Sequence, residues 1–140
     1  MAPPDADVWA GLAEHALPVG AVHEFLADER AGGTAVFVGT TRRWTGEAET
    51  AALDYHAYPA MAEASLTELA EDARQRGAIR AVALHRLGVV RPTEASVVVG
   101  VASAHRDVAF AECRRLIDRL KAETPIWKRD LRPHDPRTHD

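Results

Sequence analysis

The chain has 140 residues, of which 46% are hydrophobic and 27% charged, a composition typical of one soluble globular domain. No apolar run reaches the roughly 18 residues of a membrane span, and the first residues lack the basic start and apolar stretch of a signal peptide. The single cysteine, Cys113, excludes an internal disulfide, a cysteine-based zinc site and a paired-cysteine redox motif. We therefore expect a single domain over residues 1–140, located in the reducing cytoplasm.

Charge is distributed unevenly along the chain. The net charge of -4 argues against general nucleic-acid binding. Residues 1–80 hold 6 basic and 13 acidic residues, whereas residues 81–140 hold 11 basic and 8 acidic residues. An anionic ligand would therefore lie near the C-terminal half, although solvated, Arg-rich helix faces are the commoner cause of such asymmetry. The chain has 15 Arg but only 2 Lys, and a lysine amine can deprotonate where a guanidinium cannot.

The first half of the chain predicts strands and helices with recognisable end signals. Pro18 and Pro59 are each suited to the start of a helix, and Gly77 to the end of the second one. Alternation of β-branched and aromatic residues marks the strands. The predicted elements are a strand at 7–16, a helix at about 18–30, a strand at 34–42, an exposed loop at 43–50, a strand at 51–58 and a helix between Pro59 and Gly77.

The second half predicts a central strand followed by a long helix. Residues 95–102 are apolar on both faces, which is typical of a strand buried in a sheet. The predicted elements are a strand at 79–87, a turn at 88–94, the strand at 95–102 and a helix at about 104–122, N-capped by Ser103 and buried through Phe110, Cys113, Ile117 and Leu120. Residues from about 132 to 140 are expected to be disordered. The order predicts an α+β sandwich of a mixed or antiparallel sheet with helices packed on it.

Several polar residues in this half could carry chemistry. His105 and Arg106 begin the last long helix, where free N–H groups and the helix dipole favour an anion, although they could equally be ordinary exposed residues. Lys121 lies at the edge of the buried stripe, either as a partly desolvated amine or as a lysine whose stem covers apolar surface. His85 follows a buried strand pattern and is interpreted as structural. No second ligand at a recognisable spacing accompanies it, so no metal site is predicted.

Six segments carry a resemblance to a known family: FVGTTR (37–42), LDYHAYPAMAE (53–63), HRLG (85–88), SAHRDVAF (103–110), LIDRLK (116–121) and PIWKRD (125–130). Their order and spacing resemble those of the large, catalytic subunit of molybdopterin synthase, from about Gly33 to Asp130. The resemblance implies a sulfurtransferase of molybdenum-cofactor synthesis that acts on cyclic pyranopterin monophosphate. We expect no cofactor, since cyclic pyranopterin monophosphate would be the substrate.

The resemblance also implies partners. The sulfur donor would be the thiocarboxylated C-terminal glycine of a small ubiquitin-like protein, and two sulfur atoms would enter the pterin side chain to make a dithiolene. The family assembles as a central homodimer of large subunits with a small subunit at each end, a heterotetramer. The alternative from the residues alone is a non-catalytic dimeric adaptor that binds an anionic small molecule or an acidic peptide tail.

Residue roles follow from the same resemblance. Lys121 would lie beside the partner's tail, where it could polarise the thiocarboxylate or exchange a proton, and Lys128 would hold the pterin or the phosphate. Phe37 and the segment 125–130 are expected to wall the channel for the tail. The residues expected to bind substrate are Thr40, Thr41, Arg42, His105, Arg106, Lys121, Lys128, Arg129 and Asp130.

Overall fold

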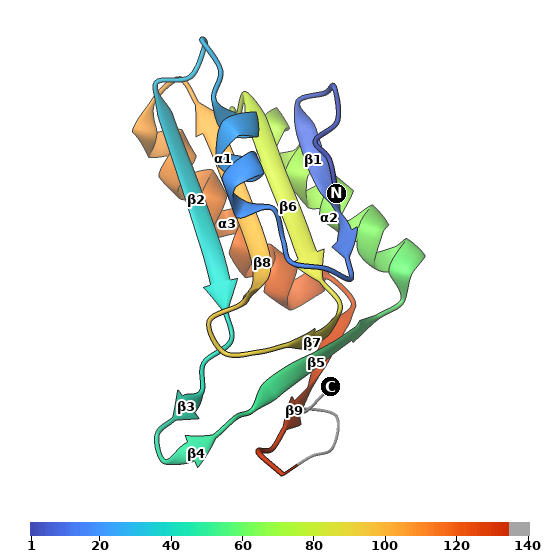
Figure 1. Ribbon diagram of the computed structural model, residues 1–140. Helices are drawn as coiled ribbons and strands as arrows, with labels where there is room; N and C mark the ends of the chain where they lie inside the picture. The colour runs from blue at the N-terminus through green and yellow to red at the C-terminus, as the bar shows by residue number, and fades with distance from the viewer. Residues whose placement is uncertain (135–140) are drawn as a thin grey trace.

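The computed structural model describes residues 1–134, which form a four-stranded sheet, a three-stranded sheet and a small hairpin, together with helices (Figure 1). The elements are β1 (Val8–Ala13), α1 (Val19–Leu26), β2 (Gly33–Thr40), β3 (Trp44–Thr45), β4 (Ala48–Glu49), β5 (Ala52–Ala57), α2 (Pro59–Gln75), β6 (Arg80–Arg86), β7 (Gly88–Val90), β8 (Ala95–Ser103), α3 (Arg106–Glu123) and β9 (Ile126–Leu131). No helix among the described residues is long and apolar enough to cross a membrane.

The main sheet has the strand order β1-β6-β8-β2. β1 runs parallel to β6, and the other two pairings are antiparallel, so the predicted mixed sheet is confirmed. β8 lies inside the sheet, as its two apolar faces indicate, and all but its first residue are buried.

Helices cover both faces of this sheet. α2 and α3 pack on one face, against alternate residues of β8 such as Val97, Val99 and Val101. The short helix α1 packs on the other face, where Leu26 lies among residues that include Val98. Gly100 permits this close approach, since a Cβ atom there would lie 2.5 Å from Cδ1 of Leu26.

The second sheet has the order β7-β5-β9 and lies beyond the end of the main sheet at which α3 finishes (Figure 1). Both of its pairings are antiparallel. Residues 88–90, predicted as part of a turn, form its edge strand β7, because the backbone of β5 offers them a partner. The predicted loop 43–50 contains the hairpin of β3 and β4, which Figure 1 shows projecting away from the helices.

Two predictions about α3 are wrong. Phe110 is not in the core but 66% exposed, because it lies beyond the cover of the main sheet, beside the edge strand β2. The N-cap residue is His105 rather than Ser103, and the hydroxyl of Ser103 donates to the carbonyl of His105. At the other end of the chain Arg132 donates to the Glu49 carbonyl, while residues 135–140 of the predicted disordered tail lie outside the described residues.

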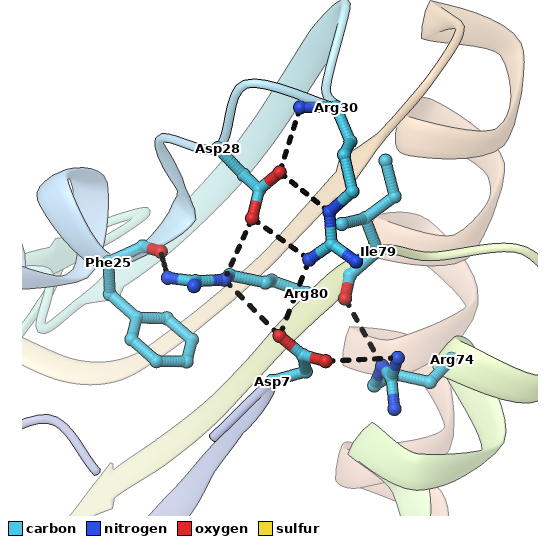
Figure 2. A network of polar contacts seen from close by, with 7 residues as sticks. All are labelled: Asp7, Phe25, Asp28, Arg30, Arg74, Ile79 and Arg80. Atoms are coloured by element: carbon cyan, nitrogen blue, oxygen red, sulfur yellow. Dashed lines mark hydrogen bonds and ion pairs between the residues drawn. The ribbon is translucent and has the colours of Figure 1, made fainter. Parts of the chain in front are cut away.

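A polar network ties the N-terminal elements to β6 (Figure 2). Arg80 donates from Nη1 to the Phe25 carbonyl at 2.7 Å, and its Nε lies 3.5 Å from Asp7 and 3.4 Å from Asp28. Asp28 is mostly buried, and the side-chain hydrogen bond from Arg30 holds the pKa of its carboxyl well below the usual range. One guanidinium therefore joins the start of β1, the end of α1 and the start of β6.

Replacing Arg80 with Met should lower the free energy of unfolding by about 1–3 kcal/mol, because a buried carbonyl loses its donor and two carboxylates lose a shared cation. Urea denaturation measures the change. Arg114→Met is the matched control, since the ion pair of Arg114 with Asp118 joins two exposed side chains and contributes less than about 1 kcal/mol. Equal losses in the two variants would contradict a structural role for the network.

Candidate functional site

Two adjoining cavities lie where the main sheet, the end of α3 and the three-stranded sheet meet. One has a volume of about 280 Å³ and includes His85; we call it the histidine cavity. The other has a volume of about 320 Å³ and includes Arg42; we call it the arginine cavity. The two cavities share four lining residues and together form what we call the lysine cleft. The shared residues are Tyr55, Ser96, Lys121 and Lys128.

The turn after α3 brings both lysines of the chain to one place. Lys121 lies in the last turn of α3, and Lys128 lies on β9. Thr124 ends the helix, with its N–H donating to the Leu120 carbonyl and its hydroxyl 2.9 Å from that of Ser65. Pro125 then directs the chain into β9, where Lys128 lies opposite Tyr55 of β5. The seven-residue spacing of the lysines thus spans a helix end and a strand.

The arginine cavity has the charge of an anion site. Arg42 and both lysines contribute three positive charges, against one negative charge from Asp130. Asp130 is held by the Thr50 hydroxyl, which donates to its Oδ2 at 3.2 Å. The net positive charge and the hydroxyls lining the same hollow, including that of Thr40, suit a phosphate or carboxylate.

The histidine cavity contains a neutral imidazole. His85 is 6% exposed, and its pKa is lowered to about 4, chiefly by burial and to a smaller extent by the positive charge of Lys121, against the hydrogen bond with the Arg86 carbonyl, which raises it. Its Nδ1 lies 2.7 Å from the Arg86 carbonyl, which can only accept, so Nδ1 carries the proton. The ring of Tyr55 packs edge-on against it, with centroids 4.9 Å apart. At neutral pH the other nitrogen, Nε2, is therefore a hydrogen-bond acceptor.

Five of the residues expected to bind substrate meet in the lysine cleft, and they are Thr40, Arg42, Lys121, Lys128 and Asp130. The others lie elsewhere within one chain. Thr41 is buried, and its hydroxyl has no partner among the described residues. Arg129 alternates with Lys128 along β9 and therefore points away from the cleft.

Three further residues are separated from the cleft. Arg106 begins α3 and His105 is its N-cap, so at 1.5 Å per residue Arg106 lies about 22 Å along the helix from Lys121, and His105 lies one residue further. Both are exposed. Phe37 lies in a different hollow, with Phe110 and Ile117, and does not line the cleft in a single chain.

Tyr55, His85 and Ser96 line the cleft but were not assigned to the site from the sequence. Tyr55 and His85 were visible as polar positions in strands, but no sequence signal distinguished a cavity wall from a satisfied core position. Ser96 lies in a strand that is otherwise apolar, and its hydroxyl donates to the Gly39 carbonyl at 3.2 Å. These three side chains lie beside the lysines only because the two sheets and the end of α3 pack together.

Comparisons with known proteins agree with this architecture. A family model described as MoaE protein matches residues 12–123. The molybdopterin synthase catalytic subunit of Thermoplasma volcanium is 43% identical over 102 residues, which cover 72% of this chain and 74% of the relative. The protein of the same name from Rattus norvegicus is 40% identical over 116 residues, which cover 82% of this chain and 58% of the relative.

A solved structure has a similar fold. The molybdopterin synthase structure from Staphylococcus aureus superposes on this chain with a TM-score of 0.84 at 28% identity, covering 90% of this chain and 93% of the other. The match of the family model spans most of the chain and includes Arg42 and Lys121, whereas Lys128 on β9 lies beyond it. The chain belongs to the MoaE family, whose relatives named here are molybdopterin synthase catalytic subunits.

Proposed function

We propose that the chain is a cytoplasmic sulfurtransferase, which moves sulfur from the thiocarboxylated C-terminal glycine of a small ubiquitin-like partner to cyclic pyranopterin monophosphate. Two such transfers make the dithiolene of molybdopterin. The observation that carries the proposal is the convergence of the only two lysines of the chain with Arg42 in one cleft. The buried, free cysteine suits a reducing compartment.

The cleft has groups for each part of this chemistry. The arginine cavity would hold the phosphate, and opening of the cyclic phosphate places negative charge on the leaving oxygen, which Lys128 and Arg42 would stabilise. Lys121, at the junction of the two cavities, would polarise the thiocarboxylate or exchange a proton as general acid–base. The proposed reaction uses these side chains and needs no resident metal or organic cofactor.

The direct test combines the protein with a thiocarboxylated ubiquitin-like partner and cyclic pyranopterin monophosphate. The expected result is a dithiolene product that accumulates while the partner's thiocarboxylate becomes a carboxylate. Mass spectrometry measures both changes. Binding of both ligands without product would instead indicate the non-catalytic adaptor.

Lys121→Arg should nearly abolish turnover although the positive charge is kept, because a guanidinium neither deprotonates nor fits a site built for a compact ammonium. Thermal unfolding should change little, since Lys121 is exposed and a long stem still covers the same surface. Single-turnover kinetics measure the loss. Lys128→Arg provides the comparison. It should keep more activity, because Lys128 is proposed to hold the substrate through its positive charge, which arginine retains. Activity like that of the wild type in Lys121→Arg would reduce Lys121 to a surface cation.

We also propose that His105 and Arg106 reach the cleft of a second copy in a homodimer. Within one chain they lie too far from Lys121 to touch the same small substrate. The edge strand β2 and α3 expose Phe37 and Phe110 around a hollow of about 560 Å³, the kind of apolar surface that subunit contacts cover.

His105→Ala and Arg106→Ala should each weaken binding of the cyclic phosphate by about 1–3 kcal/mol, because each removes a charge-assisted hydrogen bond, and binding should weaken with salt.

A mixture of Arg106→Ala and Lys121→Arg subunits tests the dimer. If each site combines Lys121 of one copy with Arg106 of the other, half of the sites in mixed dimers are intact, and roughly a quarter of the wild-type activity returns. No recovery after subunit exchange would place both residues in the same copy's site or outside it.

The partner's tail should be needed for transfer but not for docking. An extended tail loses conformational entropy on entering the cleft, so contacts of the partner's globular body must offset that cost. A partner without its last two glycines should therefore bind measurably and transfer no sulfur. Calorimetric titration and the product assay measure the two effects separately. Loss of all association on removing the tail would contradict a separate docking surface.

A further inference from the structure

In the histidine cavity, unlike the arginine cavity with its Asp130 carboxylate, the charged side chains are all hydrogen-bond donors. Lys121 and Lys128 are the charged side chains of the histidine cavity, and an ammonium can only donate hydrogen bonds. A pterin ring carries N–H donors along its edge as well as acceptors, so lysines alone cannot satisfy it. A buried donor without an acceptor costs about 1–3 kcal/mol. The site must therefore offer acceptors wherever the ring is held.

His85 is placed to be such an acceptor. Its Nδ1–H is used by the Arg86 carbonyl, and no hydrogen bond to Nε2 is found among residues 1–134. The Tyr55 ring packs edge-on against the imidazole and fixes its orientation. Ser96 assists, because its hydroxyl hydrogen goes to the Gly39 carbonyl and leaves oxygen lone pairs for a ligand. His85, whose tautomer leaves Nε2 as an acceptor, thus lines the same cavity as two cations.

The walls of the histidine cavity suit a flat ring. Val97, Leu120 and Ile126 line it together with Trp127, whereas the arginine cavity is lined mainly by hydroxyls and charges. A heterocycle has two apolar faces and a polar edge, so it fits apolar walls with one fixed acceptor. A phosphate fits the arginine cavity. The two ends of one substrate therefore match the two cavities, with both lysines at the junction.

We propose that His85 is a specificity-determining residue whose Nε2 accepts a hydrogen bond from the N–H edge of the pterin ring in the histidine cavity. The inference rests on the proposed function and extends it by assigning the ring to one cavity and the phosphate to the other. A neutral imidazole suits this task, because a protonated ring would add a third cation and lose the lone pair. The interaction selects a ring with an N–H donor over one that presents only acceptors.

The test compares His85→Leu, which removes the acceptor, with His85→Gln, which keeps an acceptor oxygen. His23→Leu is the matched control, because it makes the same substitution at an exposed position of α1. Three dissociation constants are measured for each folded variant: cyclic pyranopterin monophosphate, inorganic phosphate, and the ubiquitin-like partner in its carboxylate form. Nitrogen-15 NMR of the wild-type protein follows Nε2 of His85 as the pterin is added.

His85→Leu should weaken pterin binding on the order of tenfold, with phosphate and partner binding unchanged, and His85→Gln should recover most of the loss. The Nε2 resonance should start as that of an unprotonated nitrogen and move upfield as it accepts the hydrogen bond. Unchanged pterin affinity in His85→Leu would overturn the inference. So would an equal loss for phosphate, which indicates a collapsed cleft, or a loss for the partner alone, which places the tail there.

The two proposals fail in different ways. If the wild-type protein forms product while His85→Leu binds the pterin as tightly as the wild type, only the assignment of His85 is wrong. If the wild-type protein binds neither the pterin nor the partner, the proposed function fails, and the assignment of His85 fails with it.

Discussion

The antiparallel pairing of β9 with β5 is the constraint on which the lysine cleft depends. The chain leaves α3 at Thr124 and returns beside β5, so a helix end and a strand meet in one wall. The register places Lys128 opposite Tyr55 and Asp130 opposite Leu53, on the side that faces Lys121. A slip of one residue would turn Lys128 away and bring Arg129 into its place. The position of the second lysine is thus set by the backbone pairing of β5 with β9, in the wall of the cleft itself.

The cleft combines two electrostatic environments at short range. Around Arg42 the charges are exposed, so water and ligand phosphate can compete for them. Around His85 the wall is apolar and buried, which keeps the imidazole neutral and makes its hydrogen bond directional. Because Lys121 lines both cavities, its ammonium is positioned between a charged end and a neutral end of any ligand that spans them. This arrangement suits a reaction at the middle of a substrate with an anionic and a heterocyclic end.

The buried strands β6 and β8 hold the side chains of the cleft in place. β6 and β8 are buried between α1 on one face and α2 and α3 on the other, and both strands extend to the cleft, where they contribute His85 and Ser96. At the opposite end of the sheet, Arg80 ties β6 to the segments around β1 and α1. His85 and Ser96 therefore lie on strands held by the core, whereas Arg42 lies in the connection after β2.

Local patterns in the sequence determined most of the secondary structure, because alternation, apolar stripes and proline or glycine ends act over a few residues. They also identified the lysines, Arg42 and the start of α3, and the order of short motifs indicated the family. The tertiary structure alone decided which of these residues meet. It brought Lys128 beside Lys121, left Phe110 outside the core beyond the sheet's cover, and turned the buried His85 into a cavity wall. The physical reason is that strand register and helix packing join residues distant in sequence, and no local pattern encodes that pairing.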